Sequence, residues 1–467
     1  MEKGLAARNG GRIGLVALIA VLLLGLGLRL GEAWDGRAPV YDAKAYAAIA
    51  ANLDRGEGFT VGAGATQPSS NYSPGLPLFV AGIYELSGGV HEQLARVVLA
   101  LVGALSVLFA YLIGRRLTRS PTDPPLSSEA GRWEIVPPLI GALVVAIYPA
   151  LLEYQGMLMS EPLAATLLSG GVLAALWAWD GGRRRWLLPG VLFGALALTR
   201  PEYLAIAGLV ALVVFVREAR GDWRVSLVRA AIFLLGIVVI VAPWTVRNAV
   251  ALDRFVPIST GGGQVLFAGT YLPSDGDPEK VGAEVVAENP DLFQSQDAER
   301  LRLEQILAHL AAARYPGMET DQALSKLGKD QLWDDISGEP AEYTGFVATK
   351  VWRIWSHGPR NVMREPVWEV LHWLLIVLGL AGLAILAWQR RWEALLIGTI
   401  FLAITLVSAL LVASPRRVLV LVPLLASLAT LSLTCLPPKV QRSLNSRRYS
   451  AQNSANAPAS PSSLGAP

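Results

Sequence analysis

Long stretches without a charged side chain are the feature that most constrains the fold of this chain. Its 467 residues are 53% hydrophobic and only 16% charged, whereas about a quarter of the residues of a soluble domain are charged. Ten uncharged stretches are long enough, or nearly long enough, to cross a bilayer; they cover residues 13–28, 97–114, 135–152, 162–179, 186–199, 203–216, 230–246, 370–389, 394–415 and 418–438. The sequence therefore predicts an all-α integral membrane protein with about ten transmembrane helices.

Basic residues mark one side of the predicted membrane. The first apolar stretch has the basic flank of a secretory signal peptide, but no clear cleavage site follows it, so we interpret it as an uncleaved helix. With the N-terminus inside, every inner loop is basic, which is the cytoplasmic signature; the residues are Arg115, Arg116, Arg119, Arg183, Arg184, Arg185, Arg217, Arg220, Arg224, Arg390, Arg391, Lys439, Arg442, Arg447 and Arg448. We expect a multi-pass protein of the cytoplasmic (inner) membrane with both termini in the cytoplasm.

Two of the ten stretches, residues 186–199 and 203–216, are short. Each has about 14 uncharged residues, or about 21 Å of helix, against a hydrocarbon core of about 30 Å. Merging them into one helix would invert every later loop and destroy the basic inner pattern. We therefore keep two short spans. It stays open whether Arg200 and Glu202, which lie between them, sit below the outer surface in a protein-lined cavity.

The spans divide the chain into four predicted parts. Residues 1–247 form an N-terminal transmembrane module, whose first external loop, 30–96, carries two short surface helices. Residues 248–365 are too long for a connector, and their helix-like stretches, 297–314, 320–334 and the amphipathic 343–355, predict a mostly helical external domain. Residues 366–438 are C-terminal transmembrane helices. Residues 439–467, rich in Ser, Ala, Asn and Pro, are predicted to be a disordered cytoplasmic tail.

Several other classes of protein are excluded by what the sequence lacks. One cysteine, Cys435, cannot form an intrachain disulfide. The four histidines and the single cysteine have no zinc-ligand spacing. There is no glycine-rich loop of the kind that binds dinucleotides or nucleotide phosphates. The net charge of +3 is small and points to no polyanionic partner such as nucleic acid.

Two acids are predicted at the ends of apolar segments on the outer side. Asp42 precedes a short helix, where it suits an N-cap or a general base that reaches a substrate at the bilayer interface. Glu161 opens the span at 162–179, where the helix dipole favours a carboxylate. Both lie at the same predicted level. Together they are able to hold a divalent cation or to divide a base role and an orienting role.

Four arginines are predicted at the same outer face. Arg200 and Arg247 follow helices, and a cation there complements the dipole. Arg416 and Arg417 differ, because they precede the last span, where the dipole disfavours a cation, and they lie on the side that usually lacks positive charge. A bound anion resolves both conflicts, since guanidinium groups and helix N-termini bind phosphate. We therefore interpret the pair Arg416 and Arg417 as a phosphate site.

Short motifs in a fixed order resemble a known family. The chain is similar to the bacterial polyprenyl-phosphate-dependent glycosyltransferases of the GT-C class, which include protein O-mannosyltransferase-like enzymes and the aminoarabinose transferase of lipid A. The resemblance covers roughly residues 10–437. It rests on Tyr41-Asp42 with Tyr46, Asn52 with Gly56-x-Gly58-Phe59, Ser73-Pro74-Gly75-x-Pro77, Tyr148-Pro149 with Ser160-Glu161, Leu198-Thr199-Arg200-Pro201, and Pro243-Trp244-x-x-Arg247-Asn248.

The resemblance implies a membrane glycosyltransferase. Its expected reaction is the inverting transfer of a sugar from a polyprenyl-phosphate carrier to a protein, lipid or envelope-glycan acceptor, at the outer face of the cytoplasmic membrane. Asp42 matches the catalytic aspartate of the family and is the expected base, with Glu161 beside it. Ala43 stands where many relatives have a second acid. Any divalent cation would fall to Asp42 and Glu161, and the expected substrate-binding residues are Tyr46, Arg200, Arg247, Arg416 and Arg417.

Two alternative functions would use the same charged residues without catalysing a reaction. A transporter or flippase for lipid-linked saccharides would bind the phosphate only, and inverted repeats with broken mid-membrane helices would mark it. A non-catalytic assembly factor of the cell envelope would keep the fold alone. The sequence shows no clear repeat, and the aspartate Asp42 is intact. Both features favour the enzyme.

Overall fold

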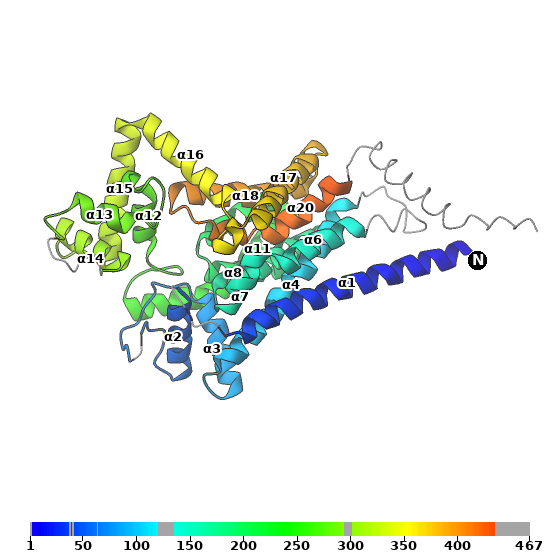
Figure 1. Ribbon diagram of the computed structural model, residues 1–467, viewed down its shortest axis with the longest axis horizontal. Helices are drawn as coiled ribbons and strands as arrows, with labels where there is room; N and C mark the ends of the chain where they lie inside the picture. The colour runs from blue at the N-terminus through cyan, green and yellow to red at the C-terminus, as the bar shows by residue number, and fades with distance from the viewer. Residues whose placement is uncertain are drawn as a thin grey trace, which may run out of the picture.

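The computed structural model describes residues 2–36, 39, 42–62, 64–119, 135–219, 221–293 and 301–434. Within these ranges all regular elements are helices, so the all-α prediction is confirmed. The predicted tail at 439–467, and Tyr41 of the first-loop motif, lie outside the described residues. The helices form an elongated bundle with a smaller group of helices at one end (Figure 1).

Six helices are long and apolar enough to cross a bilayer. They are α1 (Glu2–Trp34), α4 (Glu92–Thr118), α8 (Ser160–Trp179), α11 (Trp223–Leu252), α17 (Pro366–Trp388) and α18 (Trp392–Leu410). A seventh span arises if α6 (Val136–Ile147) and α7 (Pro149–Gly156), which meet at a bend of 42°, count as one. Among the described residues the number of spans is therefore below the predicted ten.

The missing spans are short or charged helices. Helices α9 (Leu187–Thr199) and α20 (Val422–Thr434) have 13 residues each, which gives about 20 Å of helix against a core of about 30 Å. Helix α10 (Glu202–Ala219) has 18 residues but carries acidic and basic residues at its two ends. The prediction of about ten spans was too high because it included these three helices, two of them as short spans.

Helix α8 forms the centre of the bundle. In its apolar window 83% of the residues are buried, against 17% in α1, which runs along the edge (Figure 1). Close helix crossings are made by small residues, as is common in membranes. A Cβ at Gly190 of α9 would collide with the carbonyl of Phe233 in α11, and one at Gly382 of α17 with that of Leu428 in α20. Helix α8, which carries Glu161 near its N-terminus, packs against α4, α9 and α20.

The bend between α6 and α7 has a defined cause. Pro149 has no amide hydrogen to continue the helix, and the carbonyls before it lose their helical partners. The buried guanidinium of Arg29, in α1, donates to the carbonyls of Val145 (3.1 Å) and Ala146 (3.2 Å). A backbone break inside a membrane requires such partners. The bend sets the direction of α7, which leads toward the start of α8.

Two short helices precede α4, as the sequence predicts. Helix α2 (Asp42–Asp54) and helix α3 (Gly75–Ser87) pack together through Tyr46, Ala50 and Val80. A Cβ at Gly75 would press on the backbone of Thr199 at the end of α9. This contact fixes the loop that contains Asp42 against the bundle.

The inserted segment, which we define as residues 253–365, has a core of its own. Its helices are α12 (Gly262–Thr270), α13 (Val281–Glu288), α14 (Leu303–Arg314), α15 (Thr320–Gly338) and α16 (Pro340–Ser356), with short turns η2 (Leu272–Ser274) and η4 (Asn361–Arg364). Phe267, Val285, Leu307 and Leu324 are buried together there. Helix α16 runs from this group back to the bundle (Figure 1). The remaining elements are η1 (Arg183–Trp186) and α19 (Arg416–Leu419).

Candidate functional site

The two predicted carboxylates meet at one arginine. Asp42 is the first residue of α2, and its side chain is 39% exposed. Glu161 is the second residue of α8 and is fully buried. Arg416, the first residue of α19, donates through Nη1 to Asp42 Oδ2 (2.9 Å) and through Nε to Glu161 Oε1 (2.5 Å). Residues that lie 374 positions apart in the sequence are thus in direct contact.

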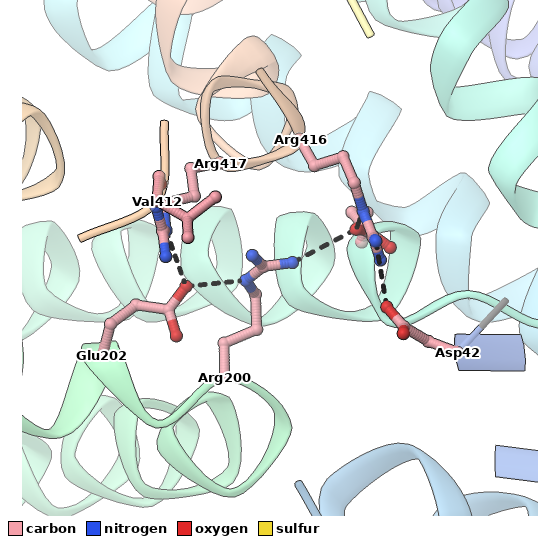
Figure 2. A network of polar contacts seen from close by, with 7 residues as sticks. Asp42, Arg200, Glu202, Val412, Arg416 and Arg417 are labelled. Atoms are coloured by element: carbon pink, nitrogen blue, oxygen red, sulfur yellow. Dashed lines mark hydrogen bonds and ion pairs between the residues drawn. The ribbon is translucent and has the colours of Figure 1, made fainter. Parts of the chain in front are cut away.

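The ion pairs continue beyond Arg416. Arg200 donates to Glu161 (3.3 Å) and to Glu202 (3.0 Å), and Arg417 lies 3.7 Å from Glu202. Figure 2 shows the resulting row of alternating charges, and we call its members the charge row: Asp42, Arg416, Glu161, Arg200, Glu202 and Arg417. Arg417 also donates to the carbonyl of Val412. Arg200 and Glu202 are both only 14% exposed.

The charge row explains why Arg416 and Arg417 are stable at a helix N-terminus on the predicted outer side, where cations are disfavoured. Three carboxylates face three guanidinium groups, so part of the expected anion is supplied by the chain itself. The conflict with a helix dipole is also weaker, because α19 has only four residues before the chain turns into α20. Burial lowers the pKa of Arg416, but the charges of Glu161 and Asp42 outweigh burial, and the net pKa is raised. The guanidinium therefore stays charged.

One carboxylate oxygen in the charge row has no hydrogen bond. Oε1 of Glu161 accepts hydrogen bonds from Arg200 and Arg416, whereas Oε2 is buried and has no partner among the described residues. A buried charged oxygen without a partner is costly. Such an atom is suited to accept a hydrogen bond from a bound molecule.

Tyr46 and Arg247 do not hydrogen-bond to the charge row. The ring of Tyr46 is nearly buried and lies edge-on to Tyr72, 5.9 Å away. Burial, and next the charges of Asp42 and Glu161, raise the pKa of Tyr46, so its hydroxyl stays protonated beside the row. Arg247 donates to the carbonyls of Ser69 (2.9 Å) and Phe59 (3.3 Å) and thus holds the first loop.

Tyr154 and Arg360 lie near the site, but they were not predicted from the sequence. The guanidinium of Arg416 lies 5.7 Å from the ring centre of Tyr154, and that of Arg360 lies 6.0 Å from it. Arg360 pairs with Glu153 (2.5 Å) and has a φ of 78°, in the left-handed region that only glycine adopts freely. The motif Tyr148-Pro149 marks this neighbourhood, but no local pattern joins Tyr154 to residues over two hundred positions away.

An apolar cavity lies between α6, α17 and α20. It has a volume of about 280 Å³. Its lining includes Ile140, Val144, Trp368, Leu375 and Ala429. Tyr148 closes one part of it, just before α7, which carries Tyr154. An apolar chain fits this lining.

Fold and site together define a multi-helix membrane protein in which the first-loop aspartate Asp42 pairs with Arg416, just before the last described helix. Neither a protein-family model nor a curated protein matches the sequence. The apo oligosaccharyltransferase of Archaeoglobus fulgidus aligns over 96% of this chain and 53% of its own, with a TM-score of 0.55 and 17% identity. The archaeal oligosaccharyltransferase AglB from Archaeoglobus fulgidus, in complex with an inhibitory peptide and a dolichol-phosphate, aligns over 97% of this chain and 52% of its own, with a TM-score of 0.53 and 16% identity.

These likenesses show that the chain shares the fold of the archaeal oligosaccharyltransferase. ArnT from Cupriavidus metallidurans bound to undecaprenyl phosphate also aligns, over 90% of this chain and 77% of its own, with a TM-score of 0.40 and 16% identity. The chain spans about half the length of the archaeal oligosaccharyltransferase.

The predicted cation ligands do not form a metal site in this arrangement. A third structure of the archaeal protein is a complex with Zn and sulfate. In the part of the present chain that the structure describes, no three His, Cys, Asp or Glu side chains gather in a way that could hold a metal ion. Asp42 and Glu161 both pair with Arg416 instead. In this arrangement the guanidinium of Arg416 occupies the place between the two carboxylates.

Proposed function

We propose that this chain is a glycosyltransferase that moves a sugar from a polyprenyl-phosphate carrier to an acceptor hydroxyl. The observation that carries the proposal is the contact of Asp42, Arg416 and Glu161, within a fold shared with an oligosaccharyltransferase. Asp42 is the most exposed carboxylate of the charge row, since its side chain is 39% exposed, against 14% for Glu202 and 0% for Glu161. It is therefore the group that a substrate reaches first.

The donor phosphate is proposed to bind at the arginine end of the row. Arg416, at 29% side-chain exposure, is the most accessible guanidinium, with Arg200 and Arg417 behind it. Guanidinium groups bind phosphate with two parallel hydrogen bonds. The apolar cavity between α6, α17 and α20 is lined by the helix that directly follows Arg416 and Arg417. It is the proposed place for the first isoprene units of the carrier.

The reaction follows from these positions. The acceptor oxygen attacks the anomeric carbon, and its proton passes to the carboxylate of Asp42. The bond between the anomeric carbon and the phosphate oxygen breaks, and its electron pair stays on the phosphate. Arg416 and Arg200 stabilise that developing charge. A single attack from the face opposite the phosphate inverts the anomeric centre.

Glu161 and Glu202 have an orienting role in this proposal. Neither is exposed enough to meet an acceptor, but each holds two arginines that stand at the donor phosphate. Fixed charges around a reacting group lower the barrier because they need not reorganise. The inserted segment is the proposed receiver of the acceptor. We propose that this segment and the site lie at the outer face of the cytoplasmic membrane, because the loops on the other side are basic.

The proposal is tested by the substitution Asp42→Asn. Membranes that contain the variant are supplied with undecaprenyl-phosphate-linked sugars carrying a radiolabel, and label transferred to protein, lipid or glycan is measured. We expect transfer to fall at least 100-fold, because a general base contributes about 10²–10⁴ to the rate. Asp54→Asn, at the other end of α2, serves as the matched control and should keep full transfer.

Two results would contradict the proposal. Asp42→Asn with full transfer would remove Asp42 from the mechanism. A wild-type chain that moves labelled lipid-linked sugar across a sealed membrane, without transferring the sugar, would establish a flippase instead.

A further inference from the structure

Lys350 is a buried lysine without a carboxylate partner in the ion pairs of the structure. It lies in α16, and only 1% of its surface is exposed. Its Nζ donates to the carbonyls of Gly269 (2.5 Å) and Ala409 (2.6 Å) and lies 5.0 Å from the ring centre of Phe346. Lysine is almost never fully buried without a reason, and the reactions proposed for the charge row do not use it.

The two carbonyls belong to the ends of two different helices. Gly269 is the last residue but one of α12, in the inserted segment, and Ala409 is the last but one of α18, in the bundle. Carbonyls in the last turn of a helix have no partner within that helix. One amine therefore completes two helix ends and ties them both to α16. Burial, and next the charge of Arg417, lower the pKa of Lys350 to about 7; the neutral amine still has hydrogen atoms for both bonds.

The chain that follows Ala409 leads directly to the charge row. Residues 411–415, which we call the arginine loop, join α18 to Arg416 and Arg417. A Cβ at Gly269 would collide with the backbone of Leu411, and Val412 packs against the core of the inserted segment. The carbonyl of Val412 in turn accepts from Arg417 (Figure 2). The inserted segment thus touches the arginine loop at its start, and the charge row holds its end.

We propose that Lys350 is a positioning residue, which holds the arginine loop so that Arg416 and Arg417 meet their carboxylates. It couples the inserted segment to the charge row. The role of Lys350 in catalysis rests on the proposed function, whereas its contacts with the loop do not depend on that function. When Lys350 loses its two bonds, the end of α18 just before the loop is no longer hydrogen-bonded to α16. Only the packing of Leu411 and Val412 then holds the loop to the inserted segment, and both arginines are held less firmly.

The test uses the full chain in lipid nanodiscs, with Cys435→Ala as background. Ser414→Cys, in the arginine loop, is partly buried, and its rate of reaction with a maleimide reports how tightly the loop is held. Lys350→Met keeps an apolar side chain of similar length and removes the donors. We expect this variant to raise the labelling rate of Ser414→Cys at least tenfold and to weaken the binding of undecaprenyl phosphate by a similar factor.

Two controls separate positioning from general stability. Lys329→Met removes an exposed lysine of α15 and should leave the labelling rate unchanged. Ala311→Cys, at 1% exposure in the core of the inserted segment, should stay unreactive in the Lys350→Met variant. A labelling rate of Ser414→Cys that does not change with Lys350→Met overturns the inference. A reactive Ala311→Cys in that variant overturns it as well, because Lys350 would then only hold the segment folded.

The two readouts also separate this inference from the proposed function. A wild-type chain that does not bind undecaprenyl phosphate counts against the proposed function. The labelling rates still decide the role of Lys350 in that case, since they require no substrate.

Discussion

Glu161 and Asp42 show how burial gives two similar residues different tasks. Glu161 is fully buried and pairs with two arginines, whereas the side chain of Asp42 is 39% exposed and pairs with one. A buried charge depends on its partners for stability, because it has lost its water. An exposed charge keeps much of its water and gains little from a pair. In the proposed function, stability and reactivity are thereby assigned to different residues of the charge row.

The separation predicts different costs for removing the two acids. Glu161→Ala leaves Arg200 and Arg416 with one carboxylate fewer in a buried place and should destabilise the protein by about 3 kcal/mol. Asp42→Ala should cost about 1 kcal/mol or less. Thermal unfolding of the purified variants measures both. Equal losses of stability would contradict the burial that the structure gives these residues.

At the scale of helices, the bundle depends on backbone groups that find partners across helices. The bend at Pro149 releases carbonyls at the end of α6, and Arg29 of α1 binds two of them. Since α7 leads into α8, this buried arginine also supports the direction in which Glu161 is presented. A charge inside a membrane span is explained here by backbone geometry and needs no ligand.

Removing that arginine should loosen the bend. In Arg29→Met the carbonyls of Val145 and Ala146 lose a donor in a place without water, and an unpaired buried polar group costs about 1–3 kcal/mol. We expect a loss of about 2–4 kcal/mol in unfolding free energy. Arg12→Met, in the same helix but exposed, is the control. If both variants melt at the wild-type temperature, Arg29 does not support the break.

The elements differ in how far the sequence predicts them. Periodicity and apolar length predict α2, α3 and α16 and the long spans, because these signals lie within one helix. The predicted number of membrane spans was too high at α9 and α20, since a buried short helix and a short span have the same composition. The contact of Arg416 with Asp42, and that of Lys350 with Ala409, join distant segments. No local pattern contains such information; the predicted topology put Asp42 and the arginines at one membrane face, but it could not predict which of them touch.

At the scale of the whole molecule, the arrangement places all proposed chemistry at one end of the bundle. The charge row lies between the first-loop helix α2 and α19, and the inserted segment adjoins it through α12 and α16. The arginine-rich turn η1 belongs to the opposite ends of α8 and α9. Either the inserted segment or η1 therefore faces the outside of the cell.

Cysteine labelling in intact cells decides that orientation. In a Cys435→Ala background, Ser337→Cys in α15 and Gly182→Cys beside η1 are both exposed positions. We expect a membrane-impermeant maleimide to modify Ser337→Cys and to spare Gly182→Cys until the cells are opened, because basic loops stay in the cytoplasm. The reverse pattern would place the inserted segment inside the cell.

The distance in sequence between Asp42 and Arg416 has a consequence for biosynthesis. A ribosome makes Asp42 early, but the guanidinium that joins it to Glu161 emerges 374 residues later. Every truncated product that ends before Arg416 lacks this bridge, however completely its earlier helices have inserted. The proposed activity therefore requires synthesis to pass Arg416, and a chain that is interrupted before this residue should not consume lipid-linked sugar.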